Sequence, residues 1–154
     1  MRRMRRKDRE LAVDAAMELL ARGEYGVLST TDIDGQPYGI PVSYAYRHPA
    51  IYIHCAPEGH KLDNLHFNPK VSFCVVGKTR VLPELFSTEY ESVIAFGVAA
   101  EVAGAEREKA LVWLLEKYSP QQITAGEAYI ASTGHLAKVI KLEITALSGK
   151  ARRA

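Results

Sequence analysis

Hydrophobic and polar residues alternate along several stretches of the chain, with the period of two that is typical of a half-buried strand. The clearest stretch is residues 136–149, where Ile140, Leu142 and Ile144 fall on one face and mainly charged residues fall on the other. The pattern predicts six strands in total, at residues 25–32, 38–47, 50–56, 70–81, 91–103 and 136–149.

Other stretches repeat their apolar residues every three or four positions, as a helix with one buried face does. In the first of them, Leu11, Ala15 and Leu19 share a face. Asp8 can cap the start of this helix and Gly23 can end it. The pattern predicts helices at residues 9–24, 59–68 and 105–119, while residues 125–133 are predicted to be helical or irregular.

The order of these elements favours an antiparallel barrel over a parallel sheet. The first three strands are joined by tight turns, one of them at Asp34-Gly35, where a positive φ is tolerated. Strands and helices do not alternate regularly, which disfavours a doubly wound parallel sheet. Pro41 lacks a donor N–H, so its side of the strand should not be paired in the middle of a sheet. We therefore expect a mainly β fold with flanking helices, built on a six-stranded antiparallel barrel.

The totals describe one ordinary globular domain. The chain has 154 residues, of which 47% are hydrophobic and 25% charged, and its formal net charge is +2. We expect a single domain over residues 1–154, with the basic segments 1–7 and 150–154 as mobile tails. No aromatic residues interleave with the arginines of these tails, so a nucleic-acid site is not favoured.

The sequence also favours a cytoplasmic location without membrane attachment. No stretch has the length of an apolar membrane span, and no apolar segment follows the basic start as in a signal peptide. Cys55 and Cys74 both lie in apolar, strand-like runs, and no CxxC motif is present. We expect both thiols to be free, as in a reducing compartment.

The junction between the third strand and the short helix, residues 52–65, collects the residues of greatest chemical interest. Gly59 lets the backbone approach a ligand closely, and His60 and Lys61 follow in the first helical turn. A helix start has unpaired N–H groups and the positive end of the helix dipole, so cationic side chains there suggest a bound anion, most simply a phosphate. The alternative is a solvent-exposed turn without a ligand.

A metal or nucleophilic site is less favoured than this phosphate site. His54, His60 and His66 are spaced six apart, which matches no common metal-ligand spacing, and no carboxylate or thiolate falls at a fitting position. We therefore predict no metal site. The chain also lacks a nucleophile elbow, a P-loop and the glycine pattern of a dinucleotide-binding fold.

The second strand could present a different binding surface. Pro41 removes one ladder donor and can leave neighbouring backbone groups free to bind the edge of a flat heterocycle. Tyr44 and Tyr46 would point to the same face. The alternative is that Val42, Tyr44 and Tyr46 are plain barrel wall.

Several motifs together resemble a known family. They are "LSTTDIDGQPYGIPVSYAY", "IYIHCAPEGHKLDNLHFNPKVSFCVVG", "STEYESVIAFGVA" and "IKLEITALSGK", and their order and spacing span nearly the whole chain. The sequence resembles the flavin-binding split-barrel superfamily, and within it the nitroimidazole-resistance branch of the pyridoxamine phosphate oxidase-like proteins. The resemblance implies a homodimer of six-stranded split barrels with FMN at the dimer interface.

The resemblance also implies which residues contact the flavin ring. Val42, Ser43 and Tyr44 would line the ring through backbone contacts, and His54 would lie beside it. His54 is the candidate catalytic residue, as a proton donor or a substrate contact, because a histidine pKa can lie near neutrality. The alternative is a histidine whose ring is satisfied by a backbone carbonyl.

The phosphate would be held at the helix start. His60, Lys61 and Asn64 would contact it, although many family members carry arginine where this chain has His60. Tyr90 and Ser92 would reach the cofactor from the other chain or close the pocket.

The leading functional hypothesis is an FMN-dependent oxidoreductase of the nitroreductase kind. It would pass electrons from reduced flavin to a small, electron-poor substrate, with NAD(P)H as the possible electron donor. The competing hypothesis is a non-catalytic protein that binds flavin, haem or deazaflavin for storage or sensing.

Overall fold

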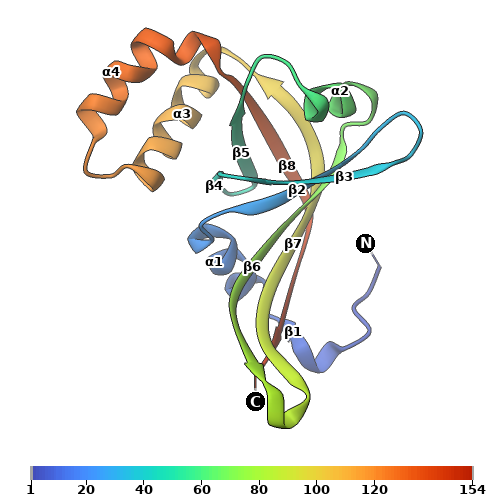
Figure 1. Ribbon diagram of the computed structural model, residues 1–154. Coiled ribbons are helices and arrows are strands. Elements are labelled where there is room, and N and C mark those ends of the chain that lie inside the picture. The colour runs from blue at the N-terminus through green and yellow to red at the C-terminus, as the bar shows by residue number, and fades with distance from the viewer. Residues whose placement is uncertain (1, 154) are drawn as a thin grey trace.

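The computed structural model describes residues 2–153 and shows one strongly curved antiparallel sheet with helices at its flanks (Figure 1). The strands are β1 (Glu10–Leu11), β2 (Gly26–Thr31), β3 (Pro37–Val42), β4 (Ala45–Arg47), β5 (Ala50–Cys55), β6 (Lys70–Leu82), β7 (Ser87–Val102) and β8 (Lys138–Arg152). The helices are α1 (Val13–Arg22), α2 (His60–Phe67), α3 (Gly104–Tyr118) and α4 (Ile123–Thr133). Short 3₁₀ turns lie at Lys7–Arg9, Pro83–Leu85 and Gly134–Leu136.

The sheet is an open barrel whose two edge strands are neighbours in the sequence. The strand order is β3-β2-β6-β7-β8-β5-β4, with β1 paired to β8. The expected fold class is therefore confirmed, but the expected count of six strands was too low. The stretch 38–47 is divided because β3 pairs with β2 while β4 pairs with β5. Pro41 lies on the edge strand β3, as its missing N–H requires.

The barrel interior follows the alternation seen in the sequence. Val71, Phe73 and Val75 of β6 are buried, whereas the residues between them are more exposed. Helix α1 contributes Leu19 and Leu20 to the same core cluster. The helix therefore uses its apolar face to cover the inside of the sheet, as its periodicity predicted.

The secondary structure near both ends of the chain differs from the sequence prediction. Asp8 was expected to cap the first helix, but α1 begins at Val13 and Asp8 forms an ion pair with Arg6 at 2.5 Å. Residues 150–152 were expected in a mobile tail, but they are the last residues of β8, paired with β7. This tail prediction was wrong because Gly149 and Ala151 are small enough to continue the buried face of β8 beneath α1.

The remaining local predictions can also be compared with the structure. Gly35 has φ 83°, as the predicted tight turn requires. Residues 125–133 are helical, within α4. Residues 2–6 have no helix or strand, and Met1 and Ala154, which end the two predicted tails, lie outside the described residues. Within the described part of the chain, no helix is long and apolar enough to cross a membrane.

Candidate functional site

The junction between β5 and α2 has the open helix start that the sequence predicted. Gly59 precedes α2 with φ 143°, a conformation that side-chain-bearing residues rarely adopt. Its carbonyl accepts the N–H groups of Leu62 and Asp63, at 2.9 and 3.2 Å. No side chain caps the start of α2. The N–H groups of His60 and Lys61, which begin the helix, are thus placed to bind an anion.

The side chains of His60 and Lys61 occupy different positions at this helix start. The His60 ring stacks on the ring of Tyr38 from β3, with centroids 4.0 Å apart and planes 29° from parallel. Lys61 is half-buried and forms no ion pair within residues 2–153. Its ammonium is close enough to His54 and Cys55 to influence the pKa of both groups. A positive charge without a carboxylate partner therefore lies beside the open helix start.

His54 is the last but one residue of β5 and lies beside this positive charge. The pKa of its ring is lowered from the ordinary value, because partial burial disfavours the imidazolium and Lys61 adds a like charge. The neutral ring therefore predominates at pH 7. Within residues 2–153 no hydrogen-bond partner is found for it, so no backbone carbonyl occupies it. His54 can thus donate to, or accept from, a ligand.

The segment expected to line a flavin ring is only partly open in the single chain. The Tyr44 side chain is completely buried, where its hydroxyl donates to the carbonyl of Leu20 and its ring meets Phe73 edge-on. This side chain is barrel wall, one of the two alternatives left open by the sequence. The backbone N–H of Tyr44 donates to the Tyr118 hydroxyl at 2.9 Å, and its carbonyl accepts from Lys117 Nζ at 2.9 Å.

Val42 and Ser43 are therefore the members of this segment that remain available to a ligand. Val42 is partly buried against the core and Ser43 is exposed, at the point where the chain crosses from β3 to β4. The structure brings this crossing to the C-terminal end of α3.

Asn64 has an internal partner. Its amide is 3% exposed and donates to Thr30 Oγ1 on β2 at 2.9 Å. Thr30 in turn donates to the carbonyl of Tyr38 at 3.4 Å. Asn64 therefore ties α2 to the sheet, and through this connection it fixes where the helix start lies.

Tyr90 and Ser92 lie far from α2 along the same chain. Ser92 pairs with Val76 on β6, whereas the residue that pairs with Lys70, just after α2, is Val98. Eight residues of strand from Tyr90 to Val98 span about 26 Å at ~3.3 Å per residue. This separation along β7 favours a contact from a second chain over closure of the pocket by Tyr90 and Ser92 of the same chain, and both remain predictions.

Tyr90 itself has a basic environment. Burial raises the pKa of its phenol, but Arg9 and Lys150 together outweigh that effect and hold the pKa below its ordinary value. The Lys150 ammonium lies 6.0 Å from the centre of its ring. An anionic or electron-rich group would find favourable charge near Tyr90.

The histidine, cysteine and carboxylate side chains were also compared with the predicted absence of a metal site within the described part of the chain. Among residues 2–153, no group of three or more histidine, cysteine, aspartate or glutamate side chains could hold a metal ion. His54 lies on β5 while His60 and His66 lie on α2, so their equal spacing in the sequence does not bring them to one point.

Sequence reasoning missed Lys117 and Tyr118. Besides its bond to the Tyr44 carbonyl, the Lys117 ammonium lies 3.6 Å from the centre of the Tyr44 ring. Burial lowers the pKa of Lys117 to about 8. The local sequence pattern does not indicate that Lys117 is buried against Tyr44, because a lysine near the end of a helix is normally solvated.

We expect replacement of Lys117 by methionine to change how stability depends on pH. The folded pKa of about 8 lies below the ordinary value of 10.5, so burial of the ammonium is unfavourable at pH 7 and the deficit disappears as pH rises from about 8 to 10.5. Lys117→Met should therefore gain stability relative to the parent at pH 7 and lose that advantage near pH 10.5. Urea denaturation of both proteins at pH 7 and pH 10 measures the difference in their free energy of unfolding at each pH. A parent–variant difference that does not change with pH would show that the amine is not desolvated.

Comparison with known proteins agrees with the geometry described above. A sequence profile of the pyridoxamine 5'-phosphate oxidase family matches residues 12–151. Among curated protein sequences, none is significantly similar to this chain.

Solved structures share the fold at low sequence identity. A candidate 5-nitroimidazole antibiotic resistance protein from Bacteroides thetaiotaomicron has a TM-score of 0.76 and 21% identity, covering 92% of this chain and 86% of that one. A conserved hypothetical protein from Mycobacterium tuberculosis has a TM-score of 0.81 and 19% identity, with coverage of 96% and 90%. An FAD- and haem-binding protein from Mycobacterium smegmatis has a TM-score of 0.80 and 17% identity, with coverage of 93% and 72%.

Proposed function

Because the chain belongs to the pyridoxamine 5'-phosphate oxidase family, we propose that it binds FMN at a site completed by a second copy of the chain. We further propose that it acts as a nitroreductase-like oxidoreductase, passing electrons from the reduced flavin to a small, electron-poor substrate. The phosphate would lie at the start of α2, and the flavin ring would lie near His54, Val42 and Ser43.

The observation that carries this proposal is the unpaired positive charge at an open helix start. Within the described residues, no carboxylate forms an ion pair with Lys61, and no side chain hydrogen-bonds to the first N–H groups of α2. A terminal phosphate matches this arrangement, because it accepts hydrogen bonds from backbone N–H groups and an ammonium at once. The Tyr38 ring holds His60 at the same end, with its exposed edge free to contribute a further hydrogen bond.

An apolar stripe on the outer face of β7 supports the second copy. Its large hydrophobic side chains are exposed by 37% (Ile94), 40% (Phe96) and 44% (Val98) in the single chain. They alternate with the buried residues of the barrel interior, so this strand is apolar on both faces. A second copy placed on this face would cover the stripe and bring its own Tyr90 and Ser92 toward the site.

The residues around the ring would divide the chemical tasks. A bound flavin supplies the transfer of electrons, with NAD(P)H as the proposed donor. His54, whose ring is mostly neutral at pH 7, would hold a hydrogen bond to the substrate, and its imidazolium form would supply a proton as the substrate is reduced. Lys61 would hold the phosphate.

A binding role without catalysis is the second candidate. His54 is the one side chain near the proposed ring site with a perturbed pKa and a free ring, so acid–base chemistry would rest on it alone among residues 2–153. The fold is shared with a protein described as binding both FAD and haem. Storage or sensing of flavin, haem or deazaflavin would use the same pocket without a substrate.

The absorbance of the purified protein, followed by stopped-flow mixing with NADH and NADPH, separates the two candidates. An oxidoreductase should be yellow and should lose its flavin absorbance when mixed with at least one of the two nucleotides. It should regain that absorbance when a nitro-heterocycle is added. A yellow protein that neither nucleotide reduces would favour the binding role, and a haem spectrum in place of the flavin spectrum would contradict both FMN and the proposed reaction.

The thiols support a cytoplasmic location for this function. Cys55 and Cys74 are both free in the structure, as predicted. Burial raises the pKa of each thiol, which keeps it protonated and unreactive near pH 7. We expect mass spectrometry of the native protein without reductant to show two free thiols per chain. A native disulfide between them would contradict the proposed location.

A further inference from the structure

A cavity lies beside His54, between the end of β5 and the helices α3 and α4. It is open to solvent, has a volume of about 620 Å³ and is lined by the end of β5, the helices α3 and α4, and the short turn that leads into β8. Most of its wall is apolar, and its large apolar lining residues are Leu111, Leu114, Leu115, Tyr129, Ile130 and Leu136. The volume is in the range of pockets that hold small molecules, roughly 300–1,000 Å³.

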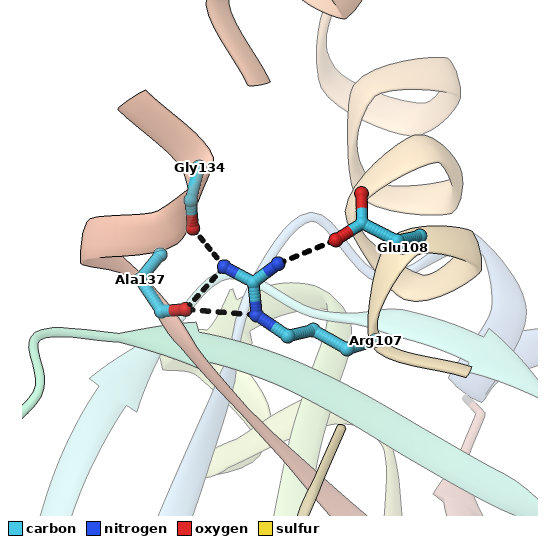
Figure 2. A network of polar contacts seen from close by, with 4 residues as sticks. All are labelled: Arg107, Glu108, Gly134 and Ala137. Atoms are coloured by element: carbon cyan, nitrogen blue, oxygen red, sulfur yellow. Dashed lines mark hydrogen bonds and ion pairs between the residues drawn. The ribbon is translucent and has the colours of Figure 1, made fainter. Parts of the chain in front are cut away.

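The walls of this cavity are fixed by contacts between α3 and the segment after α4. Arg107 on α3 donates to the carbonyl of Ala137 from Nε at 3.1 Å and from an Nη atom at 2.7 Å, and it also donates to the carbonyl of Gly134 (Figure 2). Glu108 accepts from the other end of the guanidinium at 2.7 Å. Gly126 lets α4 approach Leu115 so closely that a Cβ there would overlap the leucine side chain. These contacts fix the positions of α3, α4 and the turn after α4, and so define the shape of the cavity.

The cavity has no formal charge in its wall. No aspartate, glutamate, lysine or arginine is among the lining residues. Its titratable groups include His54 and Cys55; the pKa of the first is lowered and that of the second raised, so both are mainly neutral at pH 7. An ionised occupant would lose hydration against the leucines and would meet no charged side chain in the wall itself, because the nearby Lys61 ammonium is assigned by the proposed function to the phosphate. A neutral occupant with a flat apolar body would gain contact with the leucines, and His54, Ser119 and Thr133 could hydrogen-bond a polar group on it.

We propose that this cavity is the binding site of a neutral, electron-poor aromatic compound, whose polar group points toward His54. The proposal rests on the proposed function for the position of the flavin ring near His54. It adds where the substrate binds and which class of molecule the site selects. The occupant's lack of charge follows from the lining residues, and its electron-poor ring follows from the proposed function.

Ligand-observed NMR titration with nitrobenzene tests the proposal on the full chain, with and without FMN. The test variant is Ala137→Phe, which places a ring in the cavity wall while keeping the backbone carbonyl that Arg107 binds. The matched control is Ala131→Phe, at an exposed position of α4 outside the cavity lining. We expect nitrobenzene affinity to fall at least tenfold in Ala137→Phe and to stay within twofold of the parent in Ala131→Phe. 4-Nitrobenzoate, which carries a charge, should bind the parent at least tenfold more weakly than nitrobenzene.

Three results would overturn the proposal: no nitrobenzene binding to the parent, equal binding to both phenylalanine variants, or equal affinity for nitrobenzene and 4-nitrobenzoate. Ser119→Phe, which narrows the cavity from the α3 side, is the second variant if Ala137→Phe does not fold. FMN binding is measured separately on every variant by flavin fluorescence. A parent that binds FMN but not nitrobenzene refutes the cavity alone, whereas a parent that binds nitrobenzene but not FMN refutes the proposed function alone.

Discussion

Replacement of Lys61 by alanine is expected to weaken FMN binding roughly tenfold to a hundredfold. A hydrogen bond to a charged group is worth about 1.5–3 kcal/mol, which is about one to two decades in the dissociation constant. Lys61 forms no ion pair within the described residues, so its charge is available to the phosphate and no carboxylate is left unpaired by the change. Fluorescence titration of the flavin-free protein measures the effect.

Two controls separate loss of the phosphate contact from damage to the fold. Riboflavin lacks the phosphate, so it should bind Lys61→Ala and the parent alike. Lys109→Ala removes an exposed lysine from α3 and should leave FMN binding unchanged. If Lys61→Ala binds FMN as tightly as the parent does, the phosphate is held elsewhere.

Replacement of Phe96 by glutamate is expected to convert a homodimer into monomers and to abolish FMN binding with it. Phe96 is at the centre of the exposed stripe on β7, and burying a carboxylate in an apolar interface without a partner costs more than the roughly 2–7 kcal/mol of a neutral polar group. Light scattering at micromolar concentration gives the assembly state, and the FMN titration gives the consequence for the site.

The control for this change is Ile33→Glu, which places the same charge on an exposed residue in the turn between β2 and β3. That variant should remain dimeric. A parent protein that is monomeric at micromolar concentration would refute the second copy, and a monomeric Phe96→Glu protein that still binds FMN would show that one chain completes the site.

Alternation of polar and apolar residues predicted the barrel well because each strand of an antiparallel sheet has one buried face. The prediction for β6 held, with Val71, Phe73 and Val75 inside. The prediction failed for the stretch that contains Pro41 and Tyr44. Its pattern is that of one strand, but its first part, β3, pairs with β2 and its second part, β4, pairs with β5. A pattern along one strand cannot show a change of neighbour.

The candidate site was predictable only where its chemistry is local. Gly59, His60 and Lys61 are adjacent in the sequence, and the structure places them together at the start of α2. Lys117 and Arg107 were not recognised, because their partners are backbone carbonyls distant in the sequence. Contacts of this kind depend on where α3 packs and leave no signature in the helix itself.

The central claim, that the start of α2 binds the phosphate of FMN, is tested most directly by titrating the flavin-free parent protein with FMN and with riboflavin and following flavin fluorescence. The account predicts one FMN per chain and an affinity for FMN at least roughly tenfold higher than for riboflavin, because a charge-assisted contact to the phosphate is worth about 1.5–3 kcal/mol. Equal affinity for the two flavins, or no binding of either, would contradict it.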